Sequence, residues 1–216
     1  MTAAPAFPDL APDIASGARD LGVSLPDGAA ARLSAYLALL GRWNRAYNLT
    51  AVRDPADMVT RHVLDSLAVL PHLGAGTLLD VGSGAGLPGL VLALARPELE
   101  VTLLDSSLKK TRFLRQALAE LAVANARVAQ ARMQEYRPPR SFDMVISRAL
   151  GRLADLYRDA RHLVAPGGRL LFMKGTRPDD ELAVLDDAWG APRVVRLEVP
   201  RLAAERHLIW LERPST

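Results

Sequence analysis

Two aspartates and a run of glycines have the residue types and spacing that point most directly to chemistry. The segment LLDVGSGAGLPGL contains Asp80, Gly82, Gly84 and Gly86, so that an acid is followed by a glycine at every second position. Asp105 follows later, at the end of another apolar run. Glycine lets the backbone adopt tight turns and come close to a ligand. The pattern therefore predicts a cofactor loop with an acid on either side of it.

Three interpretations of this loop compete. Residues 84–89, GAGLPG, match the G-x-G-x-x-G fingerprint of dinucleotide-binding proteins, with Asp105 as the acid for the ribose. The glycines could also serve only tight packing of a strand against a helix. However, a pyrophosphate would be repelled by Asp80, whereas a ligand ammonium group would be attracted, directly or through water. The full pattern D-x-G-x-G-x-G thus favours S-adenosylmethionine (SAM).

The rest of the expected cofactor site follows from this assignment. The two carboxylate oxygens of Asp105 can accept hydrogen bonds from both ribose hydroxyls, and Asp105 can also cap the next helix. After the third expected strand, the backbone of Met133 and Gln134 can contact the edge of the adenine, with the Met133 side chain against its face. A plain surface turn is the alternative at that position.

Short apolar runs alternate with helical patterns from residue 77 onwards. Before that point the pattern predicts three helices, and after it seven strands and four helices. The expected helices cover residues 10–21, 27–47, 54–70, 87–96, 107–123, 152–164 and 178–189. The expected strands cover residues 77–82, 100–105, 126–131, 142–149, 169–175, 193–199 and 206–212.

Strands that alternate with helices predict a parallel sheet with helices on both faces, and the last two strands predict an antiparallel hairpin. The fold class is therefore α/β: a Rossmann-like, class I SAM-dependent methyltransferase core with a seven-stranded, mostly parallel sheet. We expect two parts, an N-terminal helical extension over residues 1–73 that packs on the core, and the SAM-binding core over residues 74–216.

Composition narrows the function further. The chain has no cysteine, and its four histidines lack metal-ligand spacing, so disulfides, cysteine nucleophiles and metal sites are not expected. No secretion signal or membrane span is apparent, which predicts a cytoplasmic protein. Net charge is only +3, but residues 109–140 contain eight Lys or Arg against two Glu. This local excess of positive charge favours a nucleic-acid partner.

The acceptor of the methyl group is narrowed by residues that are missing. Methylation at C5 of a pyrimidine normally needs a cysteine adduct, and the chain has none. Methylation of the adenine amino group usually needs a Pro-Pro-aromatic loop after the fourth strand, where this chain reads ISRALG. A ring nitrogen with a free lone pair, such as N7 of guanine, needs neither device.

Several longer segments together resemble one family. They are RWNRAYNLTAVRDPADMVTRHVLDSL (42–67), DVGSGAGLPG (80–89), LLDSSLKKTRFL (103–114), FDMVISRA (142–149) and MKG (173–175). In this order they are similar to the RsmG family, also called glucose-inhibited division protein B, of bacterial 16S rRNA guanine-N7 methyltransferases. The resemblance covers about residues 35–175. It implies methyl transfer from SAM to N7 of a guanine in the 530 loop of small-subunit rRNA.

The resemblance also implies site residues. By position, it places SAM at Gly82, Leu87, Met133 and Gln134, and it implicates Arg148 beyond the fourth strand. Family members usually have an acid where this chain has Gln134. The implied partner is 16S rRNA, in the free RNA, the small subunit or an assembly intermediate, and the protein is expected to be a monomer.

Other polar residues have two interpretations each. Arg148 can hold the SAM carboxylate or an RNA phosphate, or it can form a structural ion pair. Lys174 is a similar case at the end of the fifth strand. Basic residues that begin the helix after Asp105 can contact phosphates or simply face solvent; they are Lys109, Lys110, Arg112 and Arg115.

Motif residues in the N-terminal part complete the set of candidates. Asn48, His62, Asp65 and Ser66 lie in the NLT and RHVLDS motifs. They either tie the N-terminal helices to the sheet or line the acceptor pocket, and Asn48 and His62 are the expected RNA contacts among them. Trp43 and Tyr47 are expected in the core rather than as a platform for base stacking.

Overall fold

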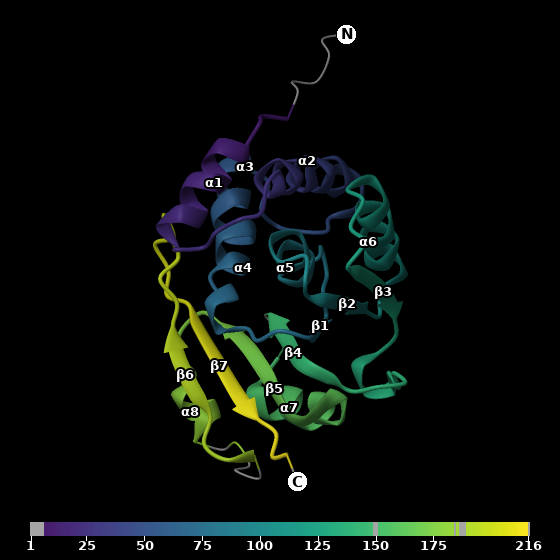
Figure 1. Ribbon diagram of the computed structural model, residues 1–216, viewed down its shortest axis with the longest axis vertical. Coiled ribbons are helices and arrows are strands. Elements are labelled where there is room, and N and C mark those ends of the chain that lie inside the picture. The colour runs from purple at the N-terminus through teal and green to yellow at the C-terminus, as the bar shows by residue number, and fades with distance from the viewer. Residues whose placement is uncertain (1–6, 149–150, 184, 186–188, 216) are drawn as a thin grey trace.

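The central feature of the fold is a seven-stranded sheet with the strand order β3-β2-β1-β4-β5-β7-β6. A computed structural model describes residues 7–148, 151–183, 185 and 189–215. The strands are β1 (Thr77–Val81), β2 (Glu100–Asp105), β3 (Ala126–Gln130), β4 (Phe142–Arg148), β5 (Val164–Lys174), β6 (Arg193–Arg196) and β7 (His207–Glu212). The first five are parallel, while β7 is antiparallel to β5 and β6. The predicted sheet with its terminal hairpin is confirmed (Figure 1).

Helices cover both faces of this sheet. One face carries α1 (Ala11–Asp20), α2 (Ala29–Tyr47), α5 (Gly89–Ala95) and α6 (Leu108–Glu120), and the other carries α7 (Leu153–Ala160) and α8 (Asp179–Leu182). Side chains alternate along each strand. In β1, Leu78 belongs to the hydrophobic cluster on the first face and Leu79 to the cluster on the second. The sheet is therefore buried on both sides, as its apolar strands predict.

The third predicted helix is interrupted by a π-helical turn. It consists of α3 (Pro55–Met58), the π-helix η1 (Val59–Leu64) and α4 (Asp65–Leu67), and a short 3₁₀ turn, Leu70–His72, follows. The side chain of Asp54 caps the helix by accepting hydrogen bonds from the backbone N–H groups of residues 56 and 57. A π-helical turn shifts the direction of the side chains after it and is frequent at functional sites. Here it contains His62 and immediately precedes Asp65.

Two element boundaries differ most from the predictions. Strand β5 begins at Val164 rather than at residue 169, because Val164 already pairs with Phe142 before a register shift in the ladder. Helix α8 ends at Leu182 rather than near residue 189. Part of the predicted end of that helix (184 and 186–188) lies outside the described residues, as does residue 149 of the predicted fourth strand.

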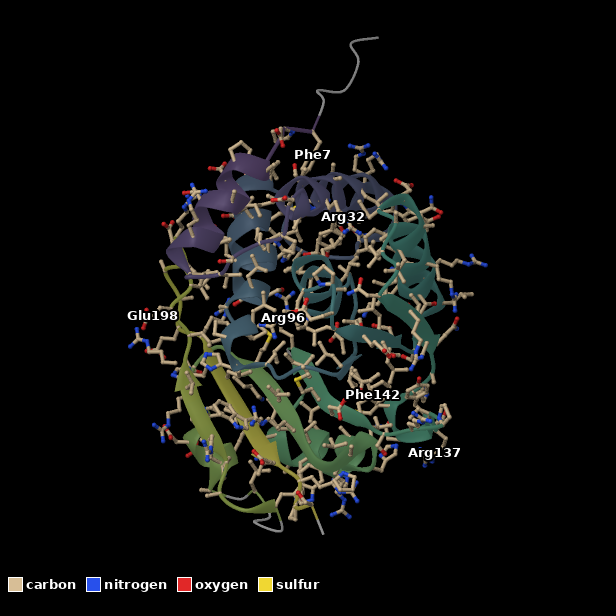
Figure 2. All side chains as sticks on the ribbon, viewed as in Figure 1. Phe7, Arg32, Arg96, Arg137, Phe142 and Glu198 are labelled. Atoms are coloured by element: carbon tan, nitrogen blue, oxygen red, sulfur yellow. The ribbon has the colours of Figure 1, made fainter. Side chains whose placement is uncertain are left out.

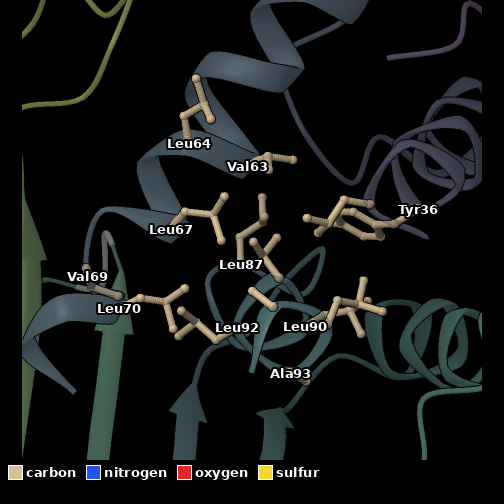
Figure 3. Packing of buried hydrophobic residues seen from close by; sticks show 14 of the residues in the cluster. Tyr36, Val63, Leu64, Leu67, Val69, Leu70, Leu87, Leu90, Leu92 and Ala93 are labelled. Carbon is tan, nitrogen blue, oxygen red and sulfur yellow. The ribbon is translucent and has the colours of Figure 1, made fainter. Parts of the chain in front are cut away.

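The N-terminal helices share one hydrophobic core with the sheet and α5. Figure 3 shows Val63 and Leu67 from the third helix beside Leu87, with Tyr36 of α2 nearby. Tyr36 is fully buried, and its hydroxyl donates a hydrogen bond to the carbonyl oxygen of Ala85 in the glycine loop, 2.8 Å away. Helix α2 therefore supports the glycine loop directly.

Two arginines make further connections between distant segments (Figure 2). Arg32 of α2 donates hydrogen bonds to the carbonyl oxygens of Leu121 and Ala122, after α6. Arg96, after α5, donates to the carbonyl oxygens of residues 70 and 73. These contacts join the N-terminal helices to the core and do not mark where one part ends and the other begins. The boundary predicted between residues 73 and 74 therefore stays a prediction.

Candidate active site

Two pockets lie at the carboxyl ends of the parallel strands, on either side of the point where β1 and β4 meet. In an open α/β sheet, chain connections diverge at such a point and ligands bind beside it. The first pocket is lined from the ends of β1, β2 and β3, and the second from the ends of β4 and β5 together with the third helix. The sheet order thus places two binding regions next to each other.

The glycine loop borders the first pocket. Gly82 and Gly84 have φ angles of 71° and 58°, in the left-handed region that favours glycine. The backbone N–H of Gly84 donates to one carboxylate oxygen of Asp105 at 2.9 Å, and that of Ser107 donates to the other at 2.8 Å. Asp105 therefore holds the loop against the residue that precedes α6. The N-cap of α6 is Ser107, and no side chain caps this helix, so the expectation that Asp105 caps it is wrong.

The first pocket has a volume of about 210 Å³ and fits the adenosine part of SAM in its chemistry. Its lining is Val81, Gly82, Leu104, Asp105, Ser106, Lys110, Ala131, Arg132, Met133 and Gln134. A carboxylate with remaining lone pairs lies on one side and suits ribose hydroxyls. Apolar side chains and a 3₁₀ turn with its backbone groups lie on the other and suit a purine ring. The structure thus brings Gly82, Asp105, Met133 and Gln134 together as predicted, and the contacts of each with SAM stay predictions.

Gln134 and Leu87 differ in what they offer this pocket. The side-chain amide of Gln134 donates to Asp159 of α7 at 2.8 Å, so that α7 holds the 3₁₀ turn in place. Leu87 is buried in the core cluster, with its backbone N–H bonded to the carbonyl oxygen of Ser83. Its side chain packs the loop from behind, which leaves only backbone groups for a ligand.

Asp80 is completely buried beneath the glycine loop. One carboxylate oxygen accepts a hydrogen bond from the backbone N–H of Gly89 at 2.9 Å, and the other has no partner among the described residues. Burial raises the pKa of Asp80 to about 6, because the charged form loses its hydration. A Cβ at Gly89 would come within 2.7 Å of Asp80. The loop–helix turn is therefore built around this carboxyl group, and its predicted contact with the SAM ammonium stays a prediction.

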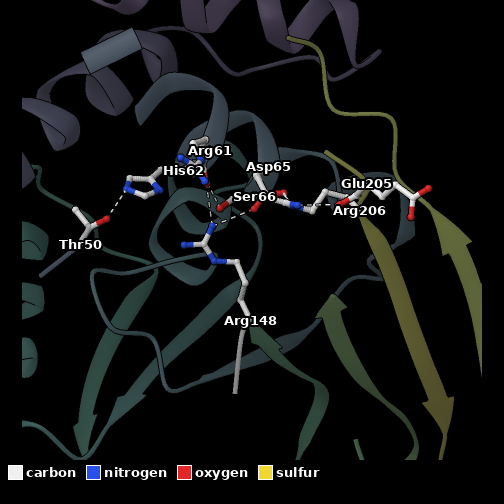
Figure 4. A network of polar contacts seen from close by, with 8 residues as sticks. All are labelled: Thr50, Arg61, His62, Asp65, Ser66, Arg148, Glu205 and Arg206. Carbon is white, nitrogen blue, oxygen red and sulfur yellow. Dashed lines mark hydrogen bonds and ion pairs between the residues drawn. The ribbon is translucent and has the colours of Figure 1, made fainter. Parts of the chain in front are cut away.

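The second pocket has a volume of about 350 Å³ and a polar network on its wall (Figure 4). Its lining is Val52, Arg61, His62, Asp65, Arg148, Met173, Lys174, Gly175 and Arg206. Four of these side chains are cationic and one is a carboxylate. Such a lining suits an anionic or strongly polar ligand.

Asp65 connects two arginines in this network. It is 3% exposed, and its two carboxylate oxygens accept from Arg148 Nη1 at 3.1 Å and from Arg206 Nε at 2.7 Å. Arg148 Nη1 also donates to the carbonyl oxygen of Arg61, in the π-helical turn. The ion pair considered for Arg148 is therefore present, and it lies at the wall of a pocket, where a ligand can still reach the rest of the guanidinium group.

His62 lies in the same wall and is buried. Its Nε2 is 3.0 Å from the hydroxyl of Thr50, and its Nδ1 has no partner among the described residues. Burial, together with the charge of Arg148, lowers the pKa of His62 to about 4. The imidazole is therefore neutral at pH 7, which limits the positive charge of the pocket.

His62 makes folding dependent on pH in a specific direction. Between pH 6.5 and 4 the unfolded chain protonates this histidine and the folded chain does not, so the contribution of His62 to stability falls as pH falls, by on the order of 3 kcal/mol. Asp80, whose raised pKa acts in the opposite sense, is the same in every variant compared. We expect the unfolding free energy of the wild type to fall relative to that of His62→Gln between pH 7 and 5, measured by urea denaturation. The exposed His162→Gln should decline as the wild type does, and equal curves for the wild type and His62→Gln would contradict this account.

The side chain of Lys174 already has partners within the protein. Its ammonium group donates to the carbonyl oxygen of Gly151 at 2.8 Å and to the carboxylate of Glu181 at 3.2 Å. Lys174 therefore fixes the start of the segment after β4 while it lines the second pocket. Its predicted role toward a ligand stays a prediction.

The remaining predicted RNA contacts lie outside the second pocket. Lys110 is at the first pocket, 3.6 Å from Asp105, and Lys109 donates to the carbonyl oxygen of Tyr47. Arg112 and Arg115 are exposed on α6. Asn48 is exposed at the end of α2, where its side chain accepts from Arg53. Among the expected RNA contacts on α6 and in the N-terminal motifs, His62 alone lines the second pocket.

The aromatic pair at the end of α2 is divided between core and surface. Trp43 packs against Phe113, with ring centroids 5.6 Å apart, as expected of a core residue. Tyr47 is 45% exposed, although its ring lies 5.2 Å from that of Trp43. The prediction of a core role is therefore wrong for Tyr47, which is the last residue of α2 and leaves much of its ring exposed to solvent.

Sequence reasoning missed Arg206. It comes from the connection between β6 and β7, far from every other residue of the pocket in sequence. Because β7 is antiparallel to β5, its first residue, His207, pairs with Lys174 at the end of β5. The expected hairpin could have pointed to this residue, since its loop must lie at the same edge of the sheet as the cofactor loop.

Neither a metal site nor a membrane helix is found in the described residues. No group of three or more His, Asp or Glu side chains there is placed to hold a metal ion. None of the helices in that part of the chain combines the length and apolar character needed to cross a membrane.

A family model and similar sequences point to the same kind of protein. The GidB family model, described as rRNA small subunit methyltransferase G, matches residues 29–209. A ribosomal RNA small subunit methyltransferase G of Alkalilimnicola ehrlichii is 52% identical over 206 residues, which cover 95% of this chain and 94% of that protein. The protein of the same name from Methylobacillus flagellatus is 52% identical over 196 residues, covering 91% and 95%.

Solved structures share the fold at low identity. A SAM dependent methyltransferase from Aquifex aeolicus has a TM-score of 0.56 and 18% identity, covering 76% of this chain and 96% of that one. The N-methyltransferase NodS from Bradyrhizobium japonicum, in complex with S-adenosyl-L-homocysteine, has a TM-score of 0.55 and 15% identity, covering 82% and 98%. These neighbours confirm the predicted class I methyltransferase fold.

Proposed function

This chain belongs to the rRNA small subunit methyltransferase G family, and from that premise we propose that it methylates N7 of a guanine in the 530 loop of bacterial 16S rRNA. The activity of the chain is SAM-dependent methylation of small-subunit rRNA. The proposal adds the base that is methylated, its position in the RNA and the reacting atom. The substrate is 16S rRNA, alone or in the small subunit or its assembly intermediate, and the enzyme works in the cytoplasm as a monomer.

The observation that carries the proposal is the arrangement of the two pockets. One has the acid, the glycine backbone and the apolar turn that suit a nucleoside cofactor, and the adjacent one is cationic. They lie on either side of the boundary between β1 and β4. With the adenosine of SAM in the first pocket, the second pocket is the neighbouring place for a polar acceptor.

Methyl transfer to a ring nitrogen requires little from the protein besides orientation. SAM, when bound, supplies an activated methyl group. N7 of guanine is scarcely protonated at neutral pH, so no general base and no covalent enzyme intermediate are needed. The protein binds the acceptor, excludes water and fixes the angle of approach, and such positioning can supply a large part of the rate. We assign no catalytic residue, and Arg148 and Lys174 are the candidates for contacting the acceptor.

The proposal is tested with tritiated SAM and small ribosomal subunits that lack the modification. We expect label in the RNA, recovered as 7-methylguanosine after digestion to nucleosides. Label in another nucleoside would contradict the assignment of N7. A thermal-shift comparison of SAM with NAD separates the methyltransferase from an oxidoreductase, since only SAM should raise the melting temperature.

Methylation of a small metabolite is the second candidate function, because the fold would be the same. The cationic pocket and the basic residues on α6 favour RNA. Binding through phosphate contacts weakens steeply with salt. We therefore expect the Michaelis constant for the acceptor to rise strongly with KCl concentration, and an acceptor constant that is independent of salt would favour the metabolite.

A further inference from the structure

Three separate features position Arg206 at the second pocket. The antiparallel register places it beside the end of β5, and the backbone N–H of Leu197 donates to its carbonyl oxygen at 2.8 Å. Its Nε donates to Asp65 at 2.7 Å, and its Nη1 donates to the carbonyl oxygen of Glu205 at 2.8 Å. The guanidinium group is therefore fixed at the pocket wall.

The fixed guanidinium group still has donors that a ligand can use. Arginine has five N–H donors in a planar fork. Within the described part of the chain, Asp65 and Glu205 account for Nε and Nη1, and Nη2 makes no hydrogen bond. The Arg206 side chain is 21% exposed. A guanidinium group held through Nε and Nη1, with Nη2 open, suits an oxyanion such as phosphate.

The charge of the pocket points to the same ligand. Arg61, Arg148, Lys174 and Arg206 outnumber Asp65 in the lining, and His62 is neutral. Lys174 is balanced by Glu181, and Asp65 is shared by Arg148 and Arg206. The excess positive charge is then spread over Arg61, Arg148 and Arg206. A guanine base is uncharged, so it does not need this excess, whereas the phosphate attached to it does.

The reacting atom also limits where an arginine can bind. An N–H donor placed on N7 would occupy the lone pair that must attack the methyl group. Because Asp65 holds both Arg148 and Arg206, neither is free to swing onto N7. This restriction leaves the nucleotide backbone as the target of Arg206.

We propose that Arg206 binds a backbone phosphate adjacent to the target guanosine, with Asp65 as the positioning residue that holds it there. This inference rests on the proposed function and adds a contact to it. It predicts that the acceptor must be a nucleotide within a chain, and not the free base.

The test measures binding of a 16S rRNA transcript at several KCl concentrations by filter retention, alongside SAM binding by calorimetry. Arg206→Gln should weaken RNA binding about tenfold and lower the slope of log K against log salt by about 0.7, the value for one contact to single-stranded RNA. Arg206→Lys should keep the slope. Arg196→Gln is the matched control, since Arg196 is exposed on the same hairpin and pairs with Glu198.

The outcomes separate this inference from the function on which it rests. Unchanged SAM affinity with a reduced salt slope in Arg206→Gln supports the phosphate contact. If Arg206→Gln melts at the wild-type temperature and its salt slope is unchanged, the phosphate contact is overturned. A loss of SAM affinity in Arg206→Gln without a change in salt slope also overturns it, because Arg206 would then contact the cofactor. If Arg206→Gln does not fold, a slope reduced in Arg206→Lys overturns it. If the wild type neither binds nor methylates the transcript or the subunit, the proposed function itself fails.

Discussion

Replacing Gly84 with leucine is expected to weaken SAM binding by at least about 100-fold, equivalent to about 2.7 kcal/mol. Gly84 has a φ of 58°, and a Cβ built there meets only the carbonyl oxygen of Gly82, at 3.7 Å. A leucine side chain would project from the loop beside Gly82, which lines the cofactor pocket. It would also disturb the hydrogen bond from Gly84 to Asp105. Calorimetry with SAM measures the effect.

Backbone strain alone must be separated from exclusion of the ligand. Gly22 has a φ of 68° with no atom within 4 Å of a built Cβ, and it lies after α1, away from both pockets at the sheet edge. Gly22→Leu should therefore carry similar strain, roughly 1–2 kcal/mol, and bind SAM as the wild type does. Unchanged SAM affinity in Gly84→Leu would show that the glycine loop is not the cofactor loop.

Removing the carboxylate of Asp65 is expected to reduce methylation of small-subunit RNA by about 100-fold, as small misplacements of a bound group do. Asp65→Ala leaves Arg148 and Arg206 without the acceptor that fixes both. The unfolding free energy should also fall by about 1–3 kcal/mol, because two partly buried donors lose their partner. Steady-state kinetics and urea denaturation measure the two effects.

A surface carboxylate provides the comparison. Asp155 is 53% exposed and pairs with Arg158 on α7 at 3.0 Å. Asp155→Ala should change stability by less than about 1 kcal/mol and leave activity intact, as exposed ion pairs contribute little. Full activity of Asp65→Ala would show that the acceptor pocket does not depend on the arginine network.

The strands and the cofactor loop were predictable because their signals are local. An apolar strand, a glycine run and an acid at the next strand end occur in order along the sequence, and parallel pairing brings their ends together. Helix α2 was equally clear from its apolar spacing. The start of β5 and the length of α8 were predicted less well, because ladder pairing and tertiary contacts decide such boundaries.

The second pocket could be predicted only in part. His62 and Asp65 stand out in their motif, but the π-helical turn that brings them into the lining of the second pocket has no signal in the sequence. Arg206 joins them through the register of β7 with β5. Tyr47 was assigned to the core together with Trp43, and an aromatic side chain at the end of a helix does not show in the sequence whether it is buried.

The central claim is the transfer of a methyl group from SAM to one guanine of small-subunit rRNA. Its most direct test is to map the methylated nucleotide after incubating unmodified small subunits with the protein and SAM, by cleavage of the RNA at 7-methylguanosine followed by primer extension. The account predicts one new stop, at a guanine of the 530 loop, that is absent with Gly84→Leu. A stop elsewhere, or methylated RNA without any cleavage at guanine, would contradict it.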